Sequence, residues 1–372
     1  MLWTYLLHCT ALILIGIVIG LTPKWMRKNV HFGVTLPFEA ANKTQVKGWY
    51  KRYFLLSIGA SFLGVVALTI AMRIANDTTT SIHTTTLFFL LLLGLLQLVL
   101  YAVFHQKAKQ FKADHYAHDR YQKKERITIE TTFRNENKPS FRWGFLIGFA
   151  LILLTTLIPI FHFDDIPNYV APHWSLGQTA AYRPKSIGFF LWIPFVQLFF
   201  LLILSFVNRI VAQTKQLINP RKPQASLKNN HTYRQGVCRF LTLIAVATNT
   251  LLLLMQLSTV FEIASVPILT RLTSIYVALI FTSLLFFMFK YGQGGSRLKE
   301  TGTDENDFEM YDDDAHWKWG MIYYNPSDPI LFVEKKIGVG VTVNFGNKTA
   351  WLIVAGVATF TIFILFLSLW HA

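Results

Sequence analysis

The chain has 372 residues, of which 53% are hydrophobic and only 15% are charged. So low a charged fraction is unusual for a soluble globular domain, and apolar windows of about 20 residues, enough to cross a hydrocarbon core of about 30 Å, recur along the chain. The formal net charge of +15 would suit nucleic acid, but the basic residues follow the connections between apolar runs, so no nucleic acid is expected as a partner.

Eight apolar runs predict an all-α membrane protein with about eight transmembrane helices in a lipid bilayer. The expected spans are residues 2–22, 53–72, 85–104, 143–161, 187–208, 236–258, 271–289 and 350–370. Of the 35 Lys and Arg residues, 31 lie in or at the edge of the connections after the first, third, fifth and seventh runs, with Arg239 at the start of the sixth run counted among them. By the positive-inside rule these connections are cytoplasmic, so both termini are expected outside the plasma membrane.

The N-terminal unit, residues 1–72, is expected to be a helical hairpin with an extended cytoplasmic segment, HFGVTLP, between its two spans. Pro37 closes this segment, and the residues after it are expected to lead into the second span as a helix. The next unit, residues 73–140, holds the third span and a basic cytoplasmic loop. The first half of this loop is expected to continue the span as a helix.

A polar loop, IPNYVAPHWSLGQTAAYRPK, separates the fourth and fifth spans in the unit formed by residues 141–210. Its aromatic side chains suit an amphipathic ligand, and its basic side chains suit an anionic group. Alternatively, its prolines and glycine only shape the turn while Trp174 anchors it and Lys185 extends its amine toward the interface. The candidate ligand-binding residues are Pro172, His173, Trp174, Gly177, Tyr182 and Lys185.

A weaker pattern in the same loop combines imidazole and carboxylate groups, which together suit zinc and similar ions. The candidate ligands are His162, Asp164, Asp165 and His173. These residues are also ordinary in a polar loop beside a membrane. The metal therefore stays unknown, and no cofactor is expected.

Pro194 in the fifth span leaves one main-chain carbonyl without its usual helical donor, so a neighbouring helix or polar side chain is expected to supply one. The sixth span is rich in Thr, Asn and Gln, which favours hydrogen bonds between helices within residues 211–290. No Asp, Glu, Lys or Arg lies in the middle of any span. This absence argues against an ion-coupled transporter that acts alone.

The region 291–349 is expected to form a small α/β-like cytoplasmic module. The last span follows it in the unit formed by residues 350–372. Its acidic run, DENDFEMYDDD, is interpreted as a solvated linker. Short strands around a tight turn follow, and VGVTVNFG echoes FGVTLP, so the two pieces are expected to share one face and pack together. The candidate module residues are Trp317, Tyr323, Tyr324, Asn325, Pro326, Asp328 and Pro329, and the aromatic ones, with Trp319, are expected in an interfacial belt.

The stretch PNYVAPHWSLGQTAAYRPKSIGFFLWIP resembles the external Pro-x-His-x-x-x-Gly motif of bacterial membrane proteins similar to the immunity protein against the sporulation-delaying toxin peptide. Where that family has an acidic residue three positions after the glycine, this chain has Ala180. The segment HWKWGMIYYNPSDPILFVEKKIGVGVTVNFGN is similar to an uncharacterised cytoplasmic module of larger multi-span proteins from Gram-positive bacteria, and GVTLPFEA resembles the start of those proteins. The positions that carry the first resemblance are Pro167, Pro172, His173, Gly177, Tyr182, Lys185 and Pro194.

The resemblance implies resistance or immunity, in which the membrane protein engages an antimicrobial or signalling peptide through residues 162–186. One alternative is a regulatory or structural subunit of a membrane exporter or sensor, whose module docks a membrane-protein or soluble partner. A second is a metal-dependent membrane enzyme, although the sequence has no nucleophile elbow, phosphate-binding glycine loop or zinc-protease motif.

Overall fold

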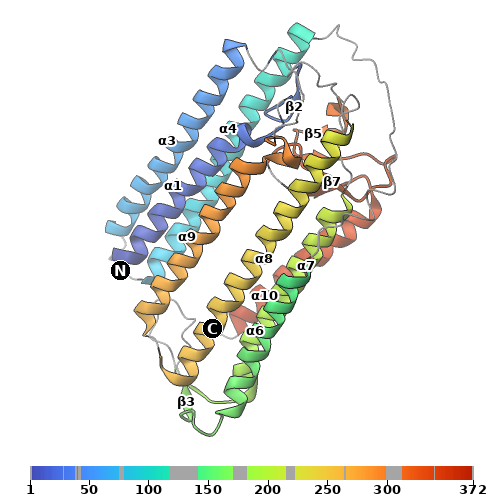
Figure 1. Ribbon diagram of the computed structural model, residues 1–372. Coiled ribbons are helices and arrows are strands. Elements are labelled where there is room, and N and C mark those ends of the chain that lie inside the picture. The colour runs from blue at the N-terminus through green and yellow to red at the C-terminus, as the bar shows by residue number, and fades with distance from the viewer. Residues whose placement is uncertain are drawn as a thin grey trace.

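A computed structural model shows a mostly helical protein whose long helices run side by side, with their connections at the two ends (Figure 1). It describes residues 2–27, 29–37, 40, 43–74, 79–116, 141–170, 182–214, 223–263, 265–298, 312–338 and 340–370. Within these residues, seven helices are long and apolar enough to cross a membrane. They are α1 (Leu2–Trp25), α3 (Thr44–Ile74), α4 (Thr79–Tyr116), α6 (Arg142–Phe161), α7 (Ile187–Gln213), α8 (Pro223–Phe261) and α9 (Val266–Tyr291).

The eighth expected span coincides with α10 (Lys348–Trp370), of which the stretch Lys348–Thr359 is apolar but shorter than a span. The predominantly helical fold is thus confirmed, and its helices are compatible with a multi-span membrane protein. The expectation of eight crossings stays a prediction.

Three helices extend well beyond the apolar runs that predicted them. α3 begins at Thr44, α4 continues to Tyr116, and α8 begins at Pro223, about a dozen residues before its apolar run. The extensions are rich in Lys, Gln and Ala, which favour helix even where the surroundings are polar. The expected helical continuations before the second span and after the third span are therefore confirmed.

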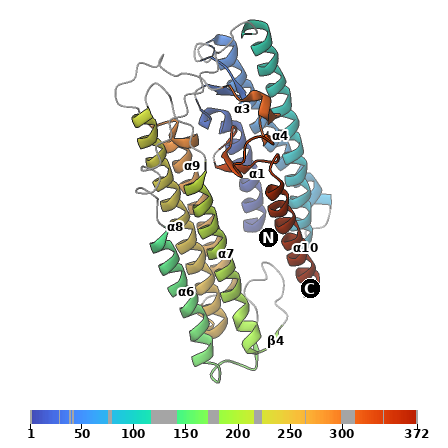
Figure 2. The ribbon, with the colours of Figure 1, turned by 90° about the vertical axis from the view of Figure 1, so that its right-hand side faces the viewer.

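The helices form two groups, which Figure 2 shows side by side. The first group contains α1, α3 and α4, and the second contains α6, α7, α8 and α9. In the first group, Gly16 of α1 brings the backbone so close to α3 that a side chain there would lie 1.9 Å from the Ser61 hydroxyl. The groups meet where the fully buried Trp25 indole packs with Tyr233 of α8 and Phe287 of α9.

In the part of the chain that the structure describes, four two-stranded antiparallel sheets lie in the connections. They pair β1 (Val30–His31) with β2 (Val34–Thr35), β3 (Tyr169–Val170) with β4 (Arg183–Pro184), β5 (Trp317–Lys318) with β6 (Ile322–Tyr323), and β7 (Phe332–Glu334) with β8 (Val341–Val343). The described residues also include two 3-10 turns, η1 (Gln293–Gly295) and η3 (Asp314–His316). We name residues 312–347 the C-terminal module.

The described part of the C-terminal module contains two β-hairpins and a 3-10 turn, and the expectation of an α/β-like module over residues 291–349 stays a prediction. The alternation of its residues did predict strands, and these are present. After the β7–β8 hairpin, α-helix begins at Lys348, where α10 starts.

The two ends of the molecule differ in content (Figure 1). One end, which we call the module end, carries the β1–β2 hairpin, the C-terminal end of α4 and the C-terminal module. The opposite end, which we call the loop end, carries the β3–β4 hairpin. Both chain termini lie away from the module end in both views. Segments expected on the same side of a membrane thus share an end.

Candidate functional site

The β3–β4 hairpin forms the base of the candidate ligand-binding loop at the loop end. Tyr169 pairs with Pro184, and Val170 pairs with Arg183. The Lys185 ammonium donates to the carbonyls of Phe163 at 3.0 Å and Ile166 at 2.7 Å, in the turns that follow α6. Carbonyls at a helix C-terminus lack helical donors and attract cations. Lys185 therefore holds the base of the loop together, which agrees with a shaping role rather than a ligand-binding one.

Only two of the six candidate ligand-binding residues lie in the described part of the chain. Tyr182 is 72% exposed beside β4, and Lys185 is engaged as above. The other four, Pro172, His173, Trp174 and Gly177, lie outside the described residues, as does Ala180. Their role in binding stays a prediction.

The candidate metal ligands do not assemble into a cluster among the residues described. His162 Nδ1 lies 3.2 Å from Asp165 Oδ2, and both side chains are largely exposed. No group of three or more His, Cys, Asp or Glu side chains placed to hold a metal is found in the described ranges. Asp164 is exposed, and His173 lies outside those ranges.

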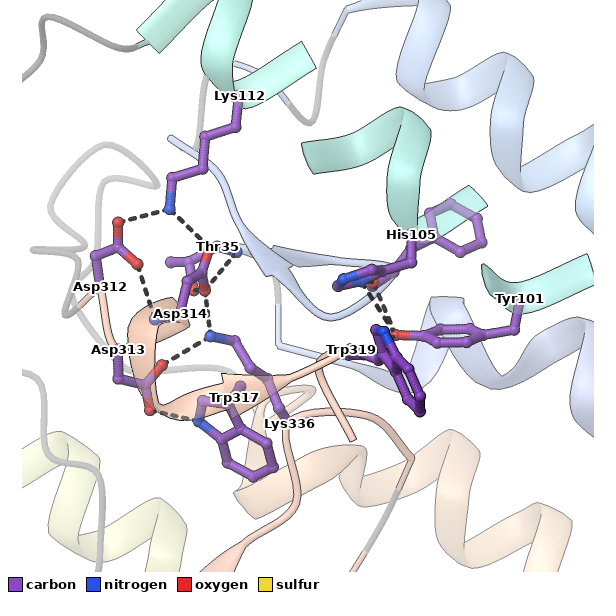
Figure 3. Close-up of polar contacts among 11 residues, drawn as sticks. Thr35, Tyr101, His105, Lys112, Asp312, Asp313, Asp314, Trp317, Trp319 and Lys336 are labelled. Atoms are coloured by element: carbon purple, nitrogen blue, oxygen red, sulfur yellow. Dashed lines mark hydrogen bonds and ion pairs between the residues drawn. The ribbon is translucent and has the colours of Figure 1, made fainter. Parts of the chain in front are cut away.

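At the module end, lysine and aspartate side chains from distant parts of the chain meet (Figure 3). Lys336 is almost fully buried, donates to Asp313 Oδ1 at 2.7 Å and makes a shorter contact with Asp314. Lys112 of α4 donates to Asp314 at 2.7 Å. We call this set, whose members are Thr35, Lys112, Asp312, Asp313, Asp314 and Lys336, the lysine–aspartate cluster.

Asp314 is the centre of the lysine–aspartate cluster. Besides the two lysines, its carboxylate accepts hydrogen bonds from the Thr35 main-chain N–H at 3.1 Å and the Thr35 hydroxyl at 2.7 Å. Burial alone would raise the pKa of Asp314, but Lys336, Lys112 and Thr35 outweigh burial and lower the pKa below its ordinary value. The interpretation of the acidic run as a solvated linker is therefore wrong for Asp313 and Asp314, which are partly buried and paired with Lys336.

The β7–β8 hairpin of the module contacts both groups of helices. Glu334 makes a salt bridge with Arg27, just after α1. Gln293, which follows α9, donates to the carbonyls of Lys335 at 3.0 Å and Gly340 at 3.1 Å, and its amide oxygen accepts from the Gly340 N–H at 3.0 Å. Because Gln293 and Glu334 are both buried, these contacts fix the hairpin in one place.

Two glycine turns touch where the module meets the first group. A side chain at Gly33, between β1 and β2, would lie 2.9 Å from the Cα of Gly320, between β5 and β6. The Tyr101 hydroxyl lies 2.9 Å from the carbonyl oxygens of both Phe32 and Trp319, so α4 holds both turns. The segment HFGVTLP thus packs against the module at Gly320 and Asp314. The expected packing of FGVTLP against the echoing VGVTVNFG stays a prediction.

The tight turn expected in the module is present and is held by a buried amide. Asp328 N–H donates to Asn325 O at 3.3 Å, with Pro326 at the position in such turns that favours proline. The amide nitrogen of Asn344, which is fully buried, lies 2.9 Å from the carbonyl oxygens of Asn325 and Asp328. Pro329 is exposed beside the turn. The residues from Asn325 to Pro329 therefore have a structural role.

The module aromatics divide between its core and its surface. Trp317 and Tyr323 are buried against Val333, so their expected place in an interfacial belt is wrong. The Trp317 indole N–H donates to Asp313 at 2.8 Å, and burial raises the pKa of Tyr323 to about 12. Trp319 is 72% exposed and Tyr324 is 43% exposed.

Sequence reasoning missed the residues that make most of these contacts, namely Arg27, Gln293, Glu334, Lys336 and Asn344. Each looks like an ordinary surface residue in the sequence, because its partner lies far away along the chain. The sequence gives one weak indication for Lys336 and Asp314. Both lie next to predicted strands, where a charged residue is sometimes buried together with a residue of opposite charge.

Residues 326–351 match the model of a family of unknown function, DUF5808. The match runs from the tight turn through the β7–β8 hairpin to the first residues of α10. It covers far less than half of the chain, so it describes this segment only. No curated protein and no solved structure matches the chain.

Proposed function

We propose that the chain is an integral protein of a bacterial plasma membrane with a regulatory role, in which the C-terminal module clamps the two groups of helices on the cytoplasmic side. One observation carries this proposal. The β7–β8 hairpin is bound to the first group through Arg27–Glu334 and to the second through Gln293. A partner that moves this hairpin would alter how the groups are held.

Because buried polar contacts of this kind are either made or broken, they favour a few distinct positions of the two helix groups over a continuous range of positions. Separating Arg27 from Glu334 leaves the buried Glu334 carboxylate without its counter-charge and with little solvent around it. Breaking a buried ion pair in this way costs several kcal/mol. A ligand that binds one arrangement better than another shifts the population between them. Binding at the loop end, between α6 and α7 of the second group, would in this way be sensed at the module end.

Distances between the groups at the loop end test the clamp. Spin labels at Ile74→Cys on α3 and Phe161→Cys on α6, both more than three-quarters exposed, report the separation in a Cys9→Ser, Cys238→Ser background in lipid nanodiscs. We expect a narrow distance distribution that broadens in Glu334→Gln. The matched control Glu262→Gln, an exposed carboxylate at the loop end, should leave it narrow. An unchanged distribution in Glu334→Gln would refute the clamp.

A second candidate function is peptide resistance of the immunity type through residues 162–186. Its support is the ordered base of the loop, where the β3–β4 hairpin and Lys185 present the exposed Tyr169 and Tyr182. Exposed tyrosines supply amphipathic contact area. Cells that lack the gene should become sensitive to a toxic peptide, and wild-type chain but not Tyr182→Ala should restore resistance. Equal sensitivity with and without the gene, across a peptide panel, would dismiss this function.

A further inference from the structure

The β5–β6 hairpin has one face that the docking of the module leaves uncovered. Trp317 pairs with Tyr323 across the hairpin, and both side chains face the module core. Lys318 pairs with Ile322, and residues next to one another along a strand face opposite sides. The outer face therefore presents Lys318 and Ile322, with Trp319 at the tip.

The conformation of Trp319 is costly for so large a side chain. Its φ is +52°, in the left-handed region where bulky residues are outliers, and Gly320 follows at +67°. The Tyr101 hydroxyl, 2.9 Å from the Trp319 carbonyl, keeps the turn in place. The turn thus projects the indole outward, where 72% of the residue is exposed. Strain of this kind at an exposed aromatic points to an external contact.

The position of Trp319 along the length of α4 indicates what this external contact is. Tyr101 lies near the end of the apolar run of α4, which gives way to His105 and then to lysines. Lys112, which binds Asp314, is eleven residues further along α4, about 16 Å away at 1.5 Å per residue. In Figure 3 these two attachment points lie well apart. The module therefore has one end at the apolar boundary and the lysine–aspartate cluster further out.

We propose that Lys318, Trp319, Ile322 and Tyr324 form an interfacial anchor that rests in the headgroup layer of the membrane. The Trp319 indole lies at the boundary with the hydrocarbon, where tryptophan is favoured. The Lys318 ammonium, 4.5 Å from the centre of the Tyr324 ring, faces the lipid phosphates. The proposal requires that the helices span a membrane, but it does not depend on the clamp or on any ligand of the loop.

Two labelled variants of the full chain compare the two ends of the module. Ile322→Cys places a fluorophore on the proposed anchor and leaves Trp319 intact, and Ala315→Cys places it on an exposed residue beside Asp314. Both are made in the Cys9→Ser, Cys238→Ser background and reconstituted in phosphatidylcholine vesicles with or without phosphatidylglycerol. Quenching is measured with a lipid that carries a nitroxide at its headgroup and with aqueous iodide.

We expect the lipid nitroxide to quench the label at residue 322 several-fold more than the label at residue 315, and iodide to show the opposite order. Adding Trp319→Ala to the Ile322→Cys chain should reduce the lipid quenching. Phosphatidylglycerol should increase the lipid quenching of the label at residue 322, because Lys318 faces the lipid phosphates. Adding Lys318→Gln should remove this increase. Equal access of iodide to both labels would overturn the proposal, because the face would then be open to water or to a soluble partner. Lipid quenching that survives Trp319→Ala would also overturn it.

Discussion

Gln256 of α8 supplies the hydrogen-bond donor that Pro194 removes from α7. In a helix the carbonyl of Phe190 would accept from the N–H of residue 194, which proline lacks. The Gln256 amide donates to that carbonyl at 2.9 Å, and Gln197 donates in return to the carbonyl of Asn249 at 3.0 Å. Each helix thus contributes a donor and an acceptor seven residues apart. The two bonds join α7 and α8 at two levels.

Replacing Gln256 by Leu should destabilise the protein more than the same replacement at Gln197. The Phe190 carbonyl would lose its substitute donor, whereas the Asn249 carbonyl can still accept from its own helix. We expect a loss of roughly 1 kcal/mol for Gln256→Leu, the scale of interhelical hydrogen bonds in membranes. Unfolding in mixed micelles measures both variants, and a larger loss in Gln197→Leu would contradict this explanation.

His31 in β1 should make stability depend on pH. Burial lowers the pKa of His31 from 6.5 to about 4, and its Nδ1 lies 2.6 Å from the Tyr50 hydroxyl. A lowered pKa means that the unfolded chain binds the proton first, so stability is complete above pH 6.5 and falls as the pH drops toward 4. The loss is on the order of 3 kcal/mol. Asp314 adds to it only below its ordinary value of 3.8.

Thermal unfolding in detergent at several pH values measures this dependence. His31→Phe should flatten the profile between pH 6.5 and 4. Tyr50→Phe removes the hydrogen bond but leaves the imidazole buried, so it should lower stability at every pH and keep the slope. A profile that stays steep in His31→Phe would assign the pH dependence to another group.

At the scale of a residue, the sequence showed which groups require a hydrogen-bond partner but not which residue supplies it. The missing donor at Pro194 could be predicted, since it follows from the chemistry of one residue. The identity of Gln256 could not, because it depends on how α7 and α8 pack. In the same way Lys185 was recognised as a residue of interest, but its carbonyl partners in the turns after α6 required the structure.

At the scale of the element, the lysine–aspartate cluster has two parts: Lys112 joins the module to α4, and Lys336 joins the β7–β8 hairpin to the acidic turn within the module. Lys336 is more buried than Lys112, with side-chain exposures of 5% and 21%. Removing Lys336 leaves Asp313 and Asp314 poorly compensated in a place with little water, which is more costly than losing a partly solvated pair.

We expect Lys336→Met to destabilise the module more than Lys112→Met, which removes the partly solvated pair with α4. The difference should be about 1–3 kcal/mol, reduced from the fully buried case because Asp314 is partly solvated. Hydrogen exchange over residues 312–347 measures it, and faster exchange in Lys336→Met should extend to the β1–β2 hairpin, which Thr35 ties to Asp314. Equal exchange in the two variants would show that burial does not set the strength of the cluster.

Elements whose pattern is local were predicted well. The helical extensions of α3 and α4 and the turn at Asn325–Asp328 follow from helix formers and turn residues close together in the chain. The acidic run was misinterpreted because charge patterning says nothing of a partner 202 residues away, the separation of Lys112 and Asp314. The alternation of residues likewise predicted strands in the module without showing which of Trp317 and Trp319 faces inward.

At the scale of the whole molecule, the distribution of basic residues predicted which segments share an end. The division of the helices into two groups could not be predicted, since connection lengths do not specify which apolar faces pack together. The side of the membrane on which each end lies stays a prediction. Membrane-protein helices associate through packing and a few polar contacts, so the joint between the two groups determines how far they move independently.

Trp25 is a fully buried apolar contact at that joint. Its side chain is fully buried at the end of α1 among side chains of α8 and α9, and its ring meets Phe289 edge-on with centroids 5.5 Å apart. Trp25→Ala should cost about 3 kcal/mol or more, because it removes a large buried side chain and leaves a cavity. Trp143→Ala, at a 73% exposed position on α6, should cost much less.

Trp25→Ala also tests whether Trp25 joins the two groups of helices or only stabilises the fold as a whole. If Trp25 joins the groups, spin labels at residues 74 and 161 should show a broader distance distribution in Trp25→Ala, while label pairs within either group keep theirs. Trp25→Phe should lie between the two, since phenylalanine retains part of the ring contact. Combined with Glu334→Gln, the broadening should exceed that of either change alone, because the indole and the β7–β8 hairpin hold the groups at separate places. Broadening within the groups as well would mean that Trp25 supports the fold as a whole.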